Sequence, residues 1–224
     1  NLLVSQMLSH TAPITIQDEQ VPYHSAPAGS SESGARSRGR EPTVTERIVT
    51  VFNGCFASPD SLNTRLAGGH EEPYYRPATH EAPLAGRLHC IEFTRDYAAS
   101  ALHEAAHWCV AGAERRLMPD YGYWYAPDGR SAAQQSEFER VEVKPQALEW
   151  IFSVACGMRF RVSADNLDAG LGPSDTFKHN IWLQVQRYCD GAINDRASQF
   201  ARALAGAFAT GDPLQADHYH LEDL

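Results

Sequence analysis

The chain has 224 residues, which is enough for one domain with a full hydrophobic core, or for one domain and a tail. Hydrophobic residues make up 43% of the chain and charged residues 21%, as in an ordinary globular protein. The net charge of −9 argues against a nucleic-acid partner and favours a cationic partner or substrate. No apolar run approaches the roughly 18 residues that a membrane span needs, so we expect no membrane association.

Residues 1–41 differ in composition from the rest of the chain. The stretch 25–42 is rich in Ser, Gly, Ala and Arg and shows no periodic apolar pattern. Such a segment cannot bury enough apolar surface to offset the entropy lost when it is ordered. We therefore predict a disordered tail over residues 1–41 and a globular domain over residues 42–224.

The cysteines indicate the compartment. They are scattered, odd in number and form no Cys-x-x-Cys pair: Cys55, Cys90, Cys109, Cys156 and Cys189. The apolar opening of the chain is too short for a secretory signal and has no basic start. These features favour free thiols in a reducing compartment, so we expect a cytoplasmic protein.

The first part of the domain is predicted to contain a helix, a long loop region and a strand. Apolar residues recur at helical spacing over 43–56, where Thr43 or Thr45 is the expected N-cap. Residues 57–86 hold four prolines and a Gly-Gly pair, which predicts loops. The alternating segment 87–93 predicts a strand.

A second helix is expected over residues 94–112. Thr94 or Asp96 is its expected N-cap, and Gly112 is expected to stop it. The aromatic segment 121–127 that follows is predicted to be strand-like.

The remainder of the chain is predicted to be helical. A helical pattern covers 136–157, where Pro145 is expected to kink the helix or open its second half. Two more helices are expected over 175–190 and 194–209, the latter capped by Asn194. The fold class predicted from these elements is α+β and helix-dominated, in one globular domain that carries a disordered N-terminal tail.

The segment ALHEAAHWCVAG contains a His-Glu-x-x-His motif. On a helix, His103 and His107 lie on one face, so both rings can reach a single ion. Glu104 lies about 100° around the helix, where it can reach a metal-bound water. Two surface histidines on a solvated helix are the alternative. A metal site is favoured because an apolar stripe covers the other face of the helix, and a buried histidine pair needs partners.

Two histidines rarely hold a catalytic divalent ion without a third ligand. The segment FERVEVKPQALEW offers Glu139 and Glu142, which are three residues apart on one helical face. Glu142 stands between two valines, which favours its facing inward. Glu137 and Glu149 are the lesser candidates.

Three segments carry a resemblance to a known family. LHEAAHWCVAGAERR, DYGYWYAPDGR and FERVEVKPQALEWIFSVACG resemble the bacterial elongation factor P hydroxylases, as do NTRLAGG and VSADNL. The resemblance runs from about residue 46 to about residue 205 and leaves the first 41 residues unexplained.

The resemblance implies an activity and a site. It implies hydroxylation of a lysine of elongation factor P that already carries a β-lysyl extension, as the last step in maturation of that factor. A non-haem metal would be held by His103, His107 and Glu142. Fe(II) is the expected metal, with Zn as the alternative and O₂ as co-substrate. Glu104 would be a catalytic residue that orients a ligand or a water.

Residues after the motif could bind the long cationic side chain of this substrate. An aromatic-lined slot would be formed by Tyr121, Tyr123, Trp124 and Tyr125. Asp120 and Asp128 could meet its ammonium groups. The alternatives are a half-buried strand for the aromatic residues and a turn for Asp128.

Two other functions fit the motif less well. A zinc metallopeptidase would use Glu104 as general base, but the sequence around the downstream glutamates lacks the second motif of that class. A metal-stabilised binding module would need a closed ligand shell, and no fourth His or Cys stands at a suitable spacing, although Cys109 follows His107 by two residues. We rank hydroxylase first, peptidase second and binding module third.

Overall fold

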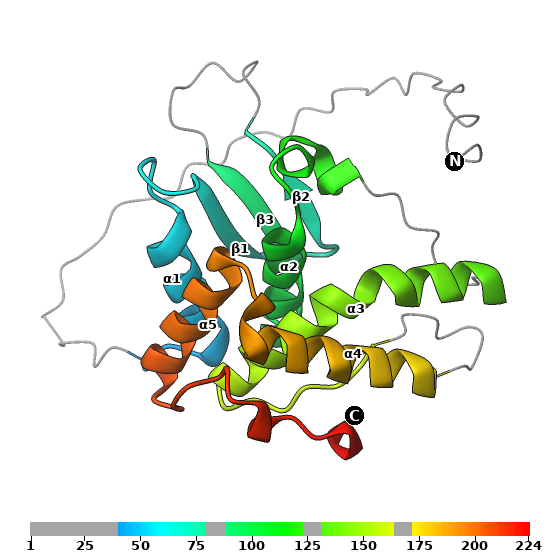
Figure 1. Ribbon diagram of the computed structural model, residues 1–224. Coiled ribbons are helices and arrows are strands. Elements are labelled where there is room, and N and C mark those ends of the chain that lie inside the picture. The colour runs from blue at the N-terminus through cyan, green and yellow to red at the C-terminus, as the bar shows by residue number, and fades with distance from the viewer. Residues whose placement is uncertain (1–39, 79–87, 123–130, 164–171) are drawn as a thin grey trace, which may run out of the picture. The chain divides into compact units, whose positions relative to one another are not determined.

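The computed structural model describes residues 40–78, 88–122, 131–163 and 172–224 (Figure 1). Apart from its last two residues, the predicted tail lies outside these ranges. So do four of the proposed substrate-binding residues: Tyr123, Trp124, Tyr125 and Asp128.

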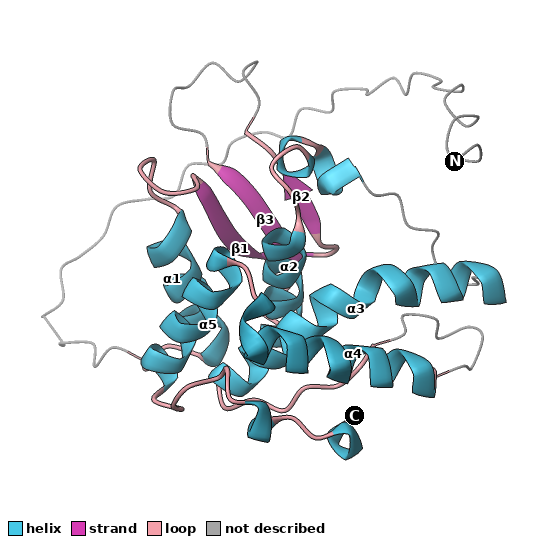
Figure 2. Cartoon of the chain, in the orientation of Figure 1, coloured by secondary structure: helices cyan, strands magenta, loops and turns pink. Residues whose placement is uncertain are grey.

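Helices dominate the described part of the chain, as the sequence predicted, and a small sheet completes an α+β fold (Figure 2). The longer helices are α1 (Val44–Phe56), α2 (Ala98–Val110), α3 (Ala132–Ala155), α4 (Asp175–Arg187) and α5 (Asp195–Phe208). The strands are β1 (Thr64–His70), β2 (Tyr74–Arg76) and β3 (His89–Thr94). Short helical turns are η1 (Arg115–Leu117), η2 (Pro119–Gly122), η4 (Tyr188–Ala192), η5 (Ala216–His218) and η6 (Leu221–Asp223).

The sheet has the strand order β1-β3-β2, in which β1 is parallel and β2 antiparallel to β3. Helix α1 packs on β1, and α2 packs on β3. Helix α3 contacts α2, α4 and α5, and α3 and α4 lie side by side (Figure 1). The two helices α2 and α3 therefore form the centre of the packed core.

Strands β1 and β2 lie in the segment that was predicted to consist of loops, so that prediction was wrong. The strands are held by pairing with β3, a long-range interaction that a local pattern of prolines and glycines does not reveal. Gly68 of β1 shows why the Gly-Gly pair does not indicate a loop here. A Cβ atom at this position would lie 2.6 Å from the carbonyl oxygen of Arg95 and 2.6 Å from the ring of Phe93. Here glycine permits a close approach within the sheet.

Helix α1 begins as predicted. The Thr43 side chain accepts a hydrogen bond from the amide of Glu46, and the Glu46 carboxylate accepts one from the amide of Thr43. The inward face of the helix buries Ile48, Phe52 and Phe56.

Helix α2 begins later than predicted. Its N-cap is Tyr97, which makes no side-chain capping bond, so neither Thr94 nor Asp96 caps it. Thr94 is still part of β3, where it pairs with His70, and the chain turns after the strand before the helix starts. The helix ends at Val110, two residues before the predicted stop at Gly112.

Helix α3 is longer than predicted and does not open at Pro145. It begins at Ala132, after a capping box formed by Ser131 and Gln134, and all 24 residues to Ala155 are helical. Helix α3 packs against α2, α4 and α5, and its residues 145–153 are all buried, so packing outweighs the local effect of the proline.

The predicted strand over 121–127 is wrong where it can be compared. Residues 119–122 form η2, in which Asp120 and Tyr121 have φ angles of 45° and 59°. Positive φ is incompatible with an extended strand.

Later in the chain, α4 and α5 match the predicted helices. Asn194 caps α5, because its side chain accepts a hydrogen bond from the amide of Ala197. Within the described ranges, no helix is long and apolar enough to cross a membrane.

Candidate metal centre

Helix α2 separates an apolar face from a face that carries two histidines. Ala101, Leu102, Ala105 and Cys109 are fully buried in the core, as the apolar stripe predicted. His103 and His107 project from the other face, with side chains that are 22% and 13% exposed. The core face fixes the rotation of the helix and therefore the direction of both imidazoles.

The two imidazoles converge on one point. The Nε2 atoms of His103 and His107 are 3.0 Å apart. From the facing helix α3, the Glu142 carboxylate places Oε1 3.2 Å from His107 Nε2 and Oε2 3.7 Å from His103 Nε2. One donor atom from each of the three residues lies within 4.8 Å of the other two. Among the described residues, one group of three or more His, Cys, Asp or Glu side chains could hold a metal ion, and it is this group.

The buried state of Glu142 tests whether a cation fits here. Its side chain is 3% exposed, and its Oε2 atom has no hydrogen-bond partner although it is buried. Burial alone would raise the pKa of Glu142, but His107 and then His103 lower it to about 2. A buried, ionised carboxylate with an unpartnered oxygen beside two imidazole nitrogens fits a divalent metal ion.

A second glutamate of α3 contacts the same histidine from another side. Oε2 of Glu149 lies 2.8 Å from Nδ1 of His103, and Glu149 is only 8% exposed. A proton on Nδ1 donated to this carboxylate leaves Nε2 free as a ligand, an arrangement common around protein-bound metals. Burial alone would lower the pKa of His103, but Glu149 and then Glu142 raise it well above 6.5 in the metal-free protein.

Glu149 was a lesser ligand candidate in the sequence, and its place beside His103 was missed. The signal was present, because Glu142 and Glu149 are seven residues apart and so share a face of α3. The other two candidates lie elsewhere. Glu139 accepts hydrogen bonds from the amide and hydroxyl of Ser174 at 3.2 and 2.6 Å, and Glu137 pairs with Arg140.

Glu104 lies outside the three-residue group. Burial raises the pKa of Glu104, although His103 and His107 oppose this effect. It is a half-buried carboxylate near the histidines, and its predicted catalytic role stays a prediction.

Comparison with known proteins then decides the family. A family model described as elongation factor P hydroxylase matches residues 51–219. The elongation factor P lysine hydroxylase of Haemophilus influenzae is 47% identical over 169 residues, which are 75% of this chain and 92% of that protein. The chain belongs to the elongation factor P hydroxylase family.

Family membership confirms the resemblance that the sequence motifs indicated. The matched segment includes the three residues that could hold a metal, His103, His107 and Glu142, and also Glu149. For a member of the elongation factor P hydroxylases, the metallopeptidase alternative is not favoured.

The structure places two of the predicted substrate-binding residues beside β2. Asp120 accepts a 2.7 Å hydrogen bond from the amide of Tyr75. Tyr121 is 5% exposed and stacks on the Tyr75 ring at a centroid distance of 4.3 Å. Its hydroxyl is buried without a partner, and burial, followed by the nearby Glu104 carboxylate, raises its pKa well above 10. Their part in substrate binding stays a prediction.

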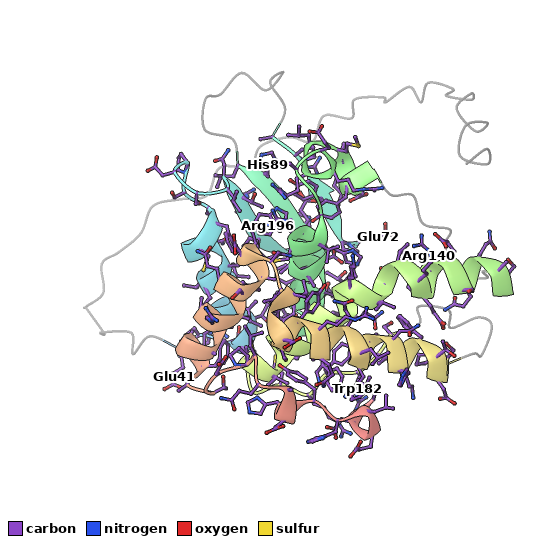
Figure 3. All side chains as sticks on the ribbon, viewed as in Figure 1. Glu41, Glu72, His89, Arg140, Trp182 and Arg196 are labelled. Carbon is purple, nitrogen blue, oxygen red and sulfur yellow. The ribbon has the colours of Figure 1, made fainter. Side chains whose placement is uncertain are left out.

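Side chains from other elements fix the C-terminal end of α2. Arg196 of α5 donates from Nη2 to the carbonyls of Cys109 and Ala111, both at 2.8 Å (Figure 3 labels Arg196 beside α2). Asn194 donates to the Cys109 carbonyl at 3.1 Å, and Arg116 donates to that of Ala111 at 2.8 Å. These cationic and amide donors satisfy carbonyls that a helix end leaves open. They hold the histidine helix in position relative to α5.

A hollow of about 360 Å³ opens beside His107. Its wall includes the last turn of α2, the segment from Gly112 to Glu114, the first residue of η1 (Arg115), and the α3 residues Val141 and Pro145. The hollow therefore lies directly beside one of the three candidate metal ligands.

Proposed function

We propose that this protein hydroxylates a lysine side chain of elongation factor P. The observation that carries the proposal is the convergence of His103, His107 and Glu142 in a chain that belongs to the elongation factor P hydroxylase family. The H. influenzae relative is named as a lysine hydroxylase of this factor, which supports the choice of residue type. We further propose the β-lysylated lysine as substrate, hydroxylation as the last step of maturation, and the cytoplasm as the location.

The proposed metal is Fe(II), bound by His103, His107 and Glu142. Three protein ligands leave coordination positions free, and ferrous iron supplies the redox chemistry with O₂ that side chains alone lack. Zinc has no redox chemistry, so a zinc ion at this site would fit the alternative function, a metallopeptidase, and not a hydroxylase. In the overall reaction, one oxygen atom of O₂ enters a C–H bond and the other leaves as water. Two electrons and two protons come from a reductant.

The chain's own residues prepare this chemistry. Glu149 holds the Nδ1 proton of His103, so Nε2 stays directed at Glu142 and His107. The hollow beside His107 admits the long alkyl stem of the substrate. Neither Asp120 nor Tyr121 lines this hollow, so contacts of the ammonium groups with Asp120 and Asp128, and of the stem with Tyr121, Tyr123, Trp124 and Tyr125, are a separate proposal.

The test uses full-length protein purified without oxygen and analysed for metal. With Fe(II), O₂ and a chemical reductant, β-lysylated elongation factor P is expected to gain the mass of one oxygen atom while its chain stays intact. The factor without the β-lysyl group is expected to be a poor substrate, because a charge-assisted contact worth about 1.5–3 kcal/mol is lost.

The Glu104→Gln variant separates this function from peptide hydrolysis. A peptidase needs Glu104 as general base and would be nearly inactive, whereas a hydroxylase keeps part of its activity. Cleavage of the factor by zinc-loaded protein, abolished in Glu104→Gln, would replace the proposal with the peptidase.

A further inference from the structure

A broad groove runs along the surface formed by α3 and α4. Its volume is about 1030 Å³, and residues of both helices line it from Gln134 to Lys144 and from Thr176 to Arg187. Its floor is apolar, because Phe138 and Phe177 are 8% and 1% exposed. The volume is at the upper end of what small-molecule sites need, which favours a segment of polypeptide as the occupant.

The groove continues into the hollow beside the candidate metal centre. Val110, Arg115 and Val141 line both spaces. A molecule bound in the groove therefore lies next to whatever enters the hollow beside His107. Continuity of this kind is what an enzyme needs if it holds a protein in one place and modifies one of its side chains in another.

The charge of the groove is opposite to that of the chain. The chain carries a net charge of −9, yet four cationic side chains line the groove: Arg115, Arg140, Lys144 and Arg187. The two carboxylates in the lining are already engaged, Glu137 with Arg140 and Glu139 with Ser174. Lys144 and Arg187 are exposed, and neither makes an ion pair or side-chain hydrogen bond among the described residues. Figure 3 labels Arg140 on α3, and Lys144 belongs to the same helix.

We propose that this groove binds an acidic surface of the protein substrate next to the lysine to be modified. The proposal rests on the proposed function, since the substrate protein is elongation factor P. Lys144 and Arg187 attract the acidic surface, and the apolar floor takes the side chains between the charges. In a chain of net negative charge, a local cationic groove also orients an acidic partner toward the metal centre.

The test reverses the two free charges. The double variant Lys144→Glu/Arg187→Glu is compared with Lys178→Glu/Arg202→Glu, which makes the same change in net charge on α4 and α5 outside the groove. Melting temperatures establish that both variants fold, and Lys144→Gln/Arg187→Gln provides a milder form of the same change. Substrates are the intact β-lysylated factor and a short peptide that carries the same modified lysine.

The groove variant is expected to raise KM for the intact factor about tenfold or more while kcat stays unchanged. Turnover of the short peptide and the kinetics of the control variant are expected to match the parent protein. Added salt is expected to weaken binding of the parent more than that of the groove variant.

Equilibrium binding of the intact factor is measured in parallel, so the groove is tested even without turnover. Absence of hydroxylation by the parent protein contradicts the proposed function. The Kd values of the parent and the groove variant for the intact factor still test the docking proposal in that case. An unchanged KM and Kd in the groove variant contradict the docking proposal. So does an equal loss of affinity for an unrelated double-stranded DNA, because that result makes the groove a general polyanion site.

Discussion

The imidazole of His103 is held between two glutamates of α3. Its Nδ1 lies 2.8 Å from Oε2 of Glu149, and its Nε2 lies 3.7 Å from Oε2 of Glu142. The two contacts use different nitrogens, so one glutamate can orient the ring while the other shares a metal with it. The spacing of seven residues along α3 makes this arrangement possible.

Replacing Glu149 tests its orienting role. Glu149→Gln keeps the size of the side chain but loses the charge that accepts the Nδ1 proton. We expect metal affinity to fall by about 10–100-fold. Isothermal titration calorimetry measures the metal affinity of the variant. Glu137→Gln is the control, because Glu137 is exposed and pairs with Arg140. Equal affinity in the two variants would show that Glu149 does not orient the ring.

The third ligand is tested by a pair of matched substitutions one helical turn apart. Glu142→Gln is expected to remove most of the metal affinity, because Glu142 is buried beside both histidines. Glu139→Gln is expected to leave metal binding intact and to lower stability by less than about 1 kcal/mol, since it only weakens the contact with Ser174. Metal content after dialysis is the measurement. The reverse order of effects would assign the ligand to Glu139.

The metal-free protein should show a characteristic dependence of stability on pH. The raised pKa of His103 stabilises the fold below pH 6.5, and this contribution is lost as pH rises through the folded-state pKa. The lowered pKa of Glu142 stabilises the fold above pH 4.5, and this contribution is lost as pH falls toward about 2. With a chelator present, these two groups therefore favour maximal stability between pH 4.5 and 6.5.

Metal is expected to change this profile at its alkaline end. A metal ion competes with the proton on His103, so its stabilising effect should grow as pH rises. Melting temperatures are recorded over about five pH units, from roughly pH 4 to 9, once with chelator and once with metal. The two series give the dependence of stability on pH for the metal-free and the metal-bound protein. A metal-induced shift in melting temperature that shrinks with rising pH would contradict the ligand role of His103.

Arg196 is expected to matter for stability although it lies outside the metal centre. Arg196→Met keeps an apolar stem but removes the donors to the carbonyls of Cys109 and Ala111, at a cost of about 2–4 kcal/mol. Arg202→Met, at an exposed position of the same helix, is expected to change stability by less than about 0.5 kcal/mol. Urea unfolding measures both. Metal affinity should also fall in Arg196→Met, because α2 carries the histidines.

Removal of residues 1–41 is expected to leave the melting temperature and activity unchanged. The capping box of α1 starts at Thr43, and the family match starts at residue 51, so the truncation spares both. A fall of several degrees in melting temperature, which for a domain of this size is about 1–2 kcal/mol, would show that the segment packs on the domain.

Local sequence patterns predicted the helices and the histidine pair. The apolar stripe of α2 and the spacing of His103 and His107 are properties of one helix, so they follow from its period alone. The caps Thr43 and Asn194 were predicted for the same reason, because a capping bond reaches only three residues along the chain. The family resemblance also came from the sequence.

What only the tertiary structure decided is which side chains meet across elements. Glu139 and Glu142 share a helical face. Only the position of α3 along α2 brings Glu142 next to the histidines, whereas Glu139 accepts a hydrogen bond from Ser174. Strands β1 and β2 exist because of pairing with β3. Helix α3 continues past Pro145 because the helix packs on three others and its second half is buried. Each of these results depends on contacts between distant segments, whose energies outweigh local propensity and have no signature within a short window of sequence.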